Sequence, residues 1–183
     1  MDARIKFIAK FLPLYFIPFF LISRVIPLGF LTDLIASTES FFLSSAGVAN
    51  TLRASFIFTT AINYEIVAEC TGLSMVILLF ALLYSAELDN KKRVKTMLFF
   101  TPILLFFNLL RLFAVLWLGA KLGQQGLDYA HPAFWFVDAA IVFAIWYYRL
   151  ETQKRKTNKN TQANKTLIKQ KKPRRLVAKD RRL

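Results

Sequence analysis

The sequence lacks the residues that covalent cross-links and metal sites need. It has one cysteine, Cys70, and one histidine, His131, among 183 residues. A single cysteine cannot close an intramolecular disulfide, and no Cys/His cluster has the spacing of a zinc site. No internal repeat is present, and no A-x-A-like cleavage site closes the first apolar run. These absences predict neither a metal ion nor a cofactor, and they favour a retained membrane anchor over a cleaved signal peptide.

Acidic residues are also scarce, with 11 Asp and Glu against 25 Lys and Arg, which gives a net charge of +14. Hydrophobic residues nevertheless make up 56% of the chain, and the mean hydropathy is +0.42. The two properties are segregated, because apolar residues fill 7–148 while 149–183 holds 14 of the 25 cations. This pattern predicts an integral membrane protein with a basic tail.

The expected fold is an all-α integral membrane protein with about four transmembrane helices in a membrane domain over 1–148. The four apolar runs that predict these spans lie at about 7–30, 70–86, 96–118 and 133–148. Three prolines are expected to kink the first span, namely Pro13, Pro18 and Pro27. The outer segment 31–69 predicts an interfacial amphipathic helix followed by a β-branched, extended stretch. The tail 149–183 is expected to be disordered.

The distribution of cations predicts the orientation of the chain. Lys and Arg cluster before the first apolar run, at 91–95 and in the tail, with few between the first and second spans or between the third and fourth. Cytoplasmic segments carry such an excess of Lys and Arg. Both termini are therefore expected in the cytoplasm.

With this orientation, three reactive side chains converge on the outer leaflet. Cys70 begins the second span, and His131 lies in the outer loop before the fourth. Arg111 lies roughly 10 Å below the outer end of the third span. A helix N-terminus, where Thr71 or the backbone can cap, and a nearby arginine both favour a thiolate. The alternatives are a small buried Cys70 and an interfacial loop His131.

Arg111 is a functional candidate by default, because an arginine within a span costs about 2.5–3.5 kcal/mol on insertion scales. Asn108 lies one turn earlier on the same helical face. Asp138 is six residues into the fourth span, at about the depth of Arg111. This spacing predicts an Arg111–Asp138 ion pair, either as a packing contact or as the support for a guanidinium that meets an oxyanion.

The motifs C-T-G-L at 70–73 and N-L-L-R at 108–111, followed by His131, resemble the exosortase/archaeosortase family over about 60–148. Its members are membrane cysteine transpeptidases of bacteria and archaea. The resemblance implies three catalytic residues, Cys70, Arg111 and His131. It leaves supporting roles to Asn108, Asp138, Thr71 and Gly72. Many members have more spans, so this chain resembles a minimal core.

The resemblance also implies a substrate and a location. Exported proteins that carry a C-terminal sorting signal, made of a short motif, a hydrophobic helix and a basic cluster, would be cleaved at the outer face of a prokaryotic plasma (inner) membrane. They would then pass to a lipid or another amine acceptor, or to water.

Other functions remain open on the sequence. In a non-enzymatic membrane scaffold or assembly protein, Arg111–Asp138 would be a packing pair and Cys70 would be inert. Nucleic-acid binding by the tail is disfavoured, because it lacks stacking aromatics. Attraction of its cations to anionic lipid explains the charge more simply. A transporter is disfavoured because no pair of matching broken helices is evident.

Overall fold

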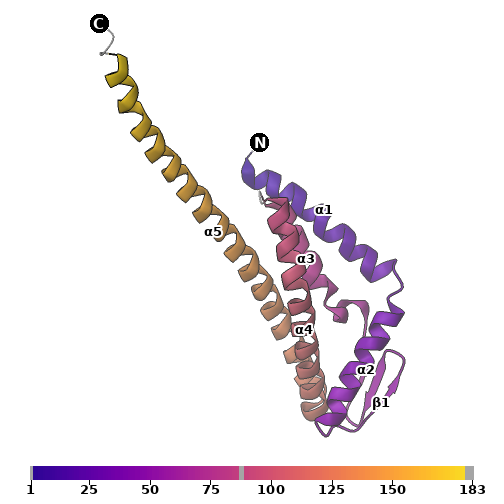
Figure 1. Ribbon diagram of the computed structural model, residues 1–183. Helices are drawn as coiled ribbons and strands as arrows, with labels where there is room; N and C mark the ends of the chain where they lie inside the picture. Colours follow the sequence, from indigo (N-terminus) through magenta and orange to yellow (C-terminus); the bar gives the residue numbers. More distant parts are fainter. Residues whose placement is uncertain (1, 87–88, 180–183) are drawn as a thin grey trace. The chain divides into compact units, whose positions relative to one another are not determined.

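The computed structural model describes residues 2–86 and 89–179. It divides into two compact units, Met1–Ala144 and Ile145–Leu183. Five helices carry most of the chain: α1 (Ala3–Arg24), α2 (Gly29–Ser45), α3 (Leu73–Ser85), α4 (Asn90–Leu122) and α5 (Gln124–Lys179) (Figure 1). The predicted helical character is therefore confirmed.

Among the described residues, three helices are long and apolar enough to cross a membrane. These candidate spans are Arg4–Arg24, Asn90–Leu122 and Gln124–Thr152. The second expected span is a shorter apolar helix, α3, of 13 residues. At helical rise it extends roughly 20 Å, less than the roughly 30 Å of a hydrocarbon core. The described part of the chain therefore has three candidate spans and one short apolar helix where the sequence predicted about four spans.

The first apolar run is divided where the sequence predicted one kinked span. Pro13 and Pro18 lie inside α1, but the helix ends at Arg24 and a new helix begins at Gly29. Pro27 lies in the break. A proline has no backbone N–H to donate and disfavours helical geometry at the residue before it, so the break falls there.

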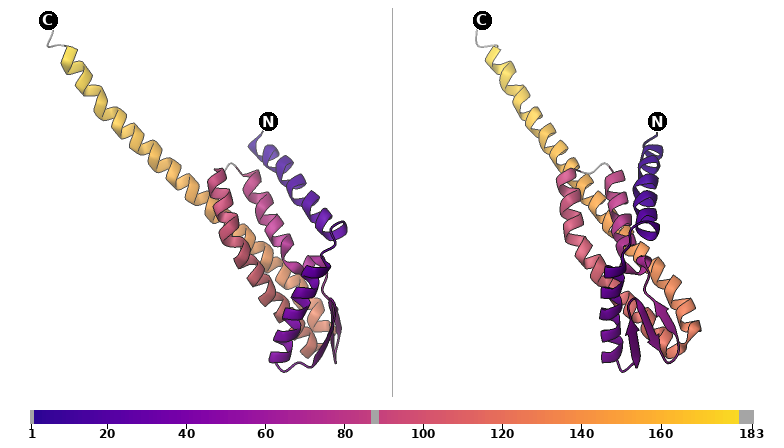
Figure 2. Two further views of the ribbon diagram at one scale, coloured as in Figure 1. Left: turned by 45° about the vertical axis from the view of Figure 1, so that its right-hand side comes forward. Right: turned by 90° about the vertical axis from the view of Figure 1, so that its right-hand side faces the viewer.

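Residues 31–69 hold both predicted conformations, a helix and an extended stretch. Most of α2 falls within this segment. A three-stranded antiparallel sheet follows, made of β1 (Asn50–Arg53), β2 (Phe56–Thr59) and β3 (Asn63–Glu65), with the order β1-β2-β3 (Figure 2). An all-α fold class is therefore wrong in this respect. The cause is local, because β-branched and aromatic residues recur here at the period of a strand.

The core of the first unit joins the sheet to α2 and α4. On α2 the residues Ile35, Ala36 and Leu43 share one face, and they pack with Leu112 and Leu116 of α4. Val48, which follows α2, and Ile57, Tyr64 and Ile66 of the sheet region complete this cluster. Meanwhile α3 packs against α1 and α4. Most of the large side chains of α1 remain exposed, as expected for a helix that faces lipid.

Two expectations about α5 are wrong. His131 lies within the helix and not in an outer loop, because Gly123, at a φ of +71°, separates α4 from α5 by one residue. The tail was expected to be disordered, but its backbone is helical as far as Lys179. The stretch 149–179 contains no glycine and is rich in Lys, Arg and Gln, which favour helices. Arg155 and Glu151 also pair one turn apart.

Candidate functional site

Cys70 lies in a short 3-10 helix, η1 (Ala68–Thr71), directly before α3. Thr71 stabilises this turn, because its hydroxyl donates to the carbonyl of Ala68 at 2.6 Å and accepts from the backbone N–H of Leu73 at 3.5 Å. Gly72 ends η1 and begins α3 with a φ of 77°. Glycine adopts this left-handed conformation at little cost. The C-T-G motif thus builds a sharp turn that carries the thiol.

Gly72 is also required by its neighbour on α4. A Cβ at this position would lie 2.8 Å from Cγ of Asn108, a separation that real Cβ atoms do not show. The close approach lets the amide nitrogen of Asn108 donate to the carbonyl oxygen of Cys70 at 2.8 Å. This bond fixes the η1 turn against α4. It joins two motifs that the sequence analysis singled out separately.

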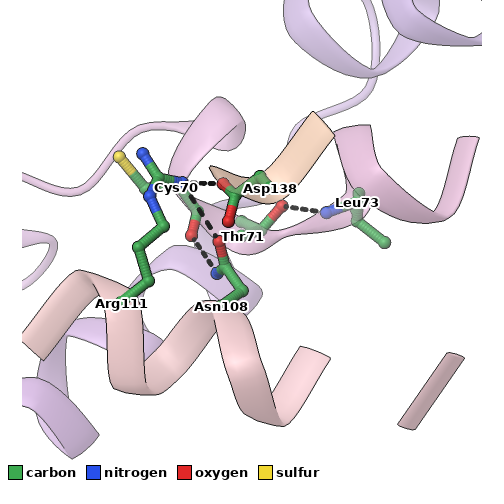
Figure 3. A network of polar contacts seen from close by, with 6 residues as sticks. All are labelled: Cys70, Thr71, Leu73, Asn108, Arg111 and Asp138. Carbon is green, nitrogen blue, oxygen red and sulfur yellow. Dashed lines mark hydrogen bonds and ion pairs between the residues drawn. The ribbon is translucent and has the colours of Figure 1, made fainter. Parts of the chain in front are cut away.

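Asn108 also links Cys70 to the buried arginine. Its amide oxygen accepts from Nη1 of Arg111 at 3.4 Å, and the same nitrogen lies 2.9 Å from Oδ2 of Asp138. Figure 3 shows this chain of contacts from the Cys70 carbonyl through Asn108 and Arg111 to Asp138. The ion pair predicted from helical depth is therefore present. Nε of Arg111 is buried and has no hydrogen-bond partner among the described residues.

Cys70 and His131 line one cavity of about 410 Å³. Its other walls come from β3 with Ile66, from Leu112, Val115 and Leu116 of α4, and from the start of α5. No hydrogen bond between Cys70 and His131 is present in the described part of the chain. The two side chains are joined only by the cavity that both of them line. Catalytic hydrogen bonds often form only once substrate is bound.

The surroundings of Cys70 do not favour the thiolate form, although two features of the sequence would favour it. Burial raises the pKa of the Cys70 thiol above its ordinary value, and a backbone hydrogen bond at Val67 and the Arg111 guanidinium lower it only in part. The carboxylate of Glu69 raises the pKa of this thiol further. The expected helix N-terminus lies beyond Cys70, at Gly72, so its dipole is one turn away. The thiol is therefore protonated at neutral pH until a base removes its proton.

Tyr64 supports the cavity wall and was not among the residues predicted from the sequence. Its hydroxyl donates to the carbonyl oxygen of Leu116 at 3.0 Å, and its side chain is 5% exposed. Gly119 makes room for it, since a Cβ there would lie 2.5 Å from the Tyr64 hydroxyl oxygen. The signal was the alternation in N-Y-E-I, which buries Tyr64 and Ile66 and leaves Asn63 and Glu65 exposed.

Within the described residues, no group of three or more His, Cys, Asp or Glu side chains is arranged to hold a metal ion. The chemistry that this arrangement offers is instead that of a thiol and an imidazole at one cavity, with a buried guanidinium held beside the turn that carries the thiol.

Comparison with known proteins gives one finding. No curated protein and no solved structure matches the chain. The family model described as transmembrane exosortase matches residues 4–147. This range includes most or all of each candidate span, the whole β-sheet, and every residue of the site described above. The chain therefore belongs to the transmembrane exosortase family.

Proposed function

We propose that this protein is a membrane cysteine transpeptidase that cleaves a C-terminal sorting signal from exported proteins and transfers them to an acceptor. The observation that carries the proposal is the common cavity of Cys70 and His131, with Arg111 fixed beside Cys70 through Asn108. Membership of the exosortase family supports this class of activity and disfavours a non-enzymatic scaffold.

In the first half-reaction, His131 takes the proton of the Cys70 thiol while Sγ attacks the scissile carbonyl carbon. A general base is needed at this step because burial raises the pKa of the thiol. The C–N bond then breaks, and His131 returns the proton to the leaving amine. The products are a thioester on Cys70 and a released C-terminal segment.

Arg111 stabilises the oxyanion of the tetrahedral intermediate. Its Nη1 is held by Asp138 and Asn108, whereas Nε has no partner among the described residues and remains available as a donor. A preorganised buried donor lowers the barrier more than one that must first reorient. Asn108 acts as a positioning residue, because its amide holds the Cys70 carbonyl. Asp138, Thr71 and Gly72 support the same geometry.

In the second half-reaction, an amine acceptor or water attacks the thioester carbonyl. His131 takes the proton of the nucleophile, and the Cys70 thiol is regenerated. A lipid headgroup amine is a suitable acceptor, because the site adjoins the candidate spans. The distribution of Lys and Arg predicts that both termini are cytoplasmic, and with that orientation this chemistry takes place on the outer face of a prokaryotic plasma membrane.

The proposal is tested by comparing C-termini of exported proteins in cells with the native protein and with Cys70→Ala. Native cells should contain proteins that lack their terminal hydrophobic helix and basic cluster, and Cys70→Ala cells should retain both. Arg111→Gln should behave like Cys70→Ala. Arg53→Gln, which alters an exposed arginine on β1, is the matched control and should process normally. Normal processing by an inserted Cys70→Ala variant would refute the function.

A further inference from the structure

The outer edge of β3 offers unpaired backbone groups to the site. Tyr64 pairs with Ile57 of β2, and the flanking bonds join Thr59 to Ile62 and Ile66 to Ser55. In an antiparallel ladder, the backbone groups of alternate residues point to opposite sides of the strand. Residues 62, 64 and 66 therefore direct their N–H and C=O groups toward β2. Asn63 and Glu65 direct theirs away from the sheet.

These outward groups have no backbone partner among the described residues. They also lie at the cavity that Cys70 and His131 line. The cavity wall on this side consists of residues 63–66. An unpaired strand edge is a template for another strand. Here the unpaired edge of β3 lines the same cavity as the Cys70 thiol.

The other edge of the sheet differs in its surroundings. β1 lies against α2, and the side chain of Asn50 donates to the hydroxyl of Ser44 at 2.9 Å and to the carbonyl of Val48 at 2.9 Å. This edge does not contribute to the cavity. The sheet therefore has one edge tied to a helix and one edge facing the reactive side chains.

The β3 edge is also held firmly enough to act as a template. Tyr64 is anchored to α4 by its hydrogen bond to the Leu116 carbonyl, and Ile57 and Ile66 are buried on either side of it. A rigid edge reduces the entropy that is lost when a peptide binds.

We propose that the segment around the scissile bond binds as a fourth strand against β3, with its backbone paired to Asn63 and Glu65. This inference rests on the proposed function, since it names how that site holds its substrate. Main-chain hydrogen bonds then provide affinity, and an extended backbone carries the scissile carbonyl from β3 toward Cys70. The side chains of the peptide alternate between the apolar α4 wall and the opposite side.

A peptide electrophile tests the pairing without knowledge of the natural signal. The probe is acetyl-Ala-Ala-Ala-chloromethyl ketone, whose carbon bonds to Sγ of Cys70 as chloride leaves, and chloroacetone is the control that lacks a peptide backbone. Strand pairing predicts labelling about tenfold faster with the peptide, the preference that one or two net hydrogen bonds confer. N-methylation of a peptide amide that faces β3 should abolish this advantage. N-methylation of the next amide, which faces away, should not.

Matched proline variants test the same pairing from the protein side. Asn63→Pro and Glu65→Pro remove outward N–H groups and leave the β2 ladder bonds intact. Leu52→Pro removes an outward N–H at the opposite edge, on β1, and is the control. The first two should lower the peptide rate to the chloroacetone rate, and Leu52→Pro should leave the ratio unchanged. If a proline variant does not fold, the N-methylated peptides on the native protein decide.

The outcomes separate the inference from the proposed function. A peptide no faster than chloroacetone, or equal rates with and without N-methylation, would overturn strand pairing even if Cys70→Ala abolishes processing in cells. Processing that continues in Cys70→Ala would overturn the function, whatever the labelling ratio.

Discussion

Asp138 and Glu39 are both buried carboxyl groups, but only one of them has a partner. Asp138 is 6% exposed and pairs with Arg111, whereas Glu39 on α2 is 0% exposed and neither of its oxygens has a partner in the described part of the chain. Burial alone raises the pKa of Glu39 to about 8. A buried carboxyl group without a cation is thus held neutral at pH 7, while the candidate site keeps a compensated charge.

This difference indicates why the site needs its acid. Arg111 cannot become neutral, because the pKa of a guanidinium is too high, so its burial requires an anion or an oxyanion nearby. Asp138 supplies the anion, and Asn108 accepts a further hydrogen bond. Nε has no partner among the described residues. Glu39 can lose its charge by binding a proton, so it needs no partner.

The largest expected effect on stability comes from removing the carboxylate that pairs with Arg111, which would leave this buried cation without its ion pair. Asp138→Ala should lower the free energy of unfolding by about 3–5 kcal/mol, the usual cost of breaking a buried pair by removing one member. Processing should fall with it. Unfolding in detergent is the measurement, and Asp33→Ala, which alters an exposed acid of α2, should change stability by less than about 0.5 kcal/mol. Equal stabilities for the two variants would mean that the pair is unimportant.

The second effect concerns the close packing of the network. Gly72→Ala and Gly47→Ala both place a side chain at positive φ, 77° and 76°, but only position 72 has a neighbour within 4 Å. Gly47→Ala should cost about 1 kcal/mol from backbone strain. Gly72→Ala should cost about 1–3 kcal/mol more, since Cβ overlaps Asn108. Chemical unfolding of the two variants separates strain from contact, and identical losses would show that the contact is relaxed without cost.

A separate effect, spread over more than three pH units and modest at each of them, is a pH dependence due to Glu39. The pKa rises from 4.5 in the unfolded chain to about 8 in the fold, so its contribution to stability is complete below pH 4.5 and is lost as pH rises through about 8. Over this window the stability should fall by about 1.4 kcal/mol per pH unit from this group. Glu39→Gln should remove that slope. A slope unchanged in Glu39→Gln would show that the carboxyl is not buried in solution.

The smallest effect is on the thiol. Glu69 raises the pKa of Cys70, so Glu69→Gln should lower that pKa and speed alkylation by iodoacetamide at a fixed pH near 8. The change should be less than about tenfold, since a single partly exposed carboxylate contributes little. Glu65→Gln is the control, because Glu65 lines the cavity but does not act on the thiol. Slower alkylation in Glu69→Gln would reverse the sign assigned to this carboxylate.

Parts of the site could be predicted from the sequence because helices have a fixed rise. Depth along two apolar runs was enough to pair Arg111 with Asp138. The contact of Gly72 with Asn108 could not be predicted, because it joins η1 to α4 across a turn whose path the sequence does not define. The prediction that His131 lies in a loop was wrong, because Gly123 alone makes the turn between α4 and α5 that a longer loop was expected to make.

The sheet and Glu39 show a different reason for missing features. Residues 51–69 were expected to be extended, but which edge would face Cys70 depends on strand order and register, which no local pattern specifies. Glu39 follows Ile35 and Ala36 and precedes Leu43 at helical spacing, so the periodicity did place it on the buried face. An acid in an amphipathic segment is ordinarily exposed, and the spacing alone does not decide between the two positions.

The most direct test of the account is to look for the acyl-enzyme on Cys70. The protein would be isolated rapidly from cells that export its substrates, and the peptide containing Cys70 would be analysed by mass spectrometry. The account predicts a peptidyl adduct on Sγ that hydroxylamine removes and that is absent from Arg111→Gln. Unmodified Cys70 throughout, together with continued processing in Cys70→Ala cells, would contradict the claim that this thiol is the nucleophile.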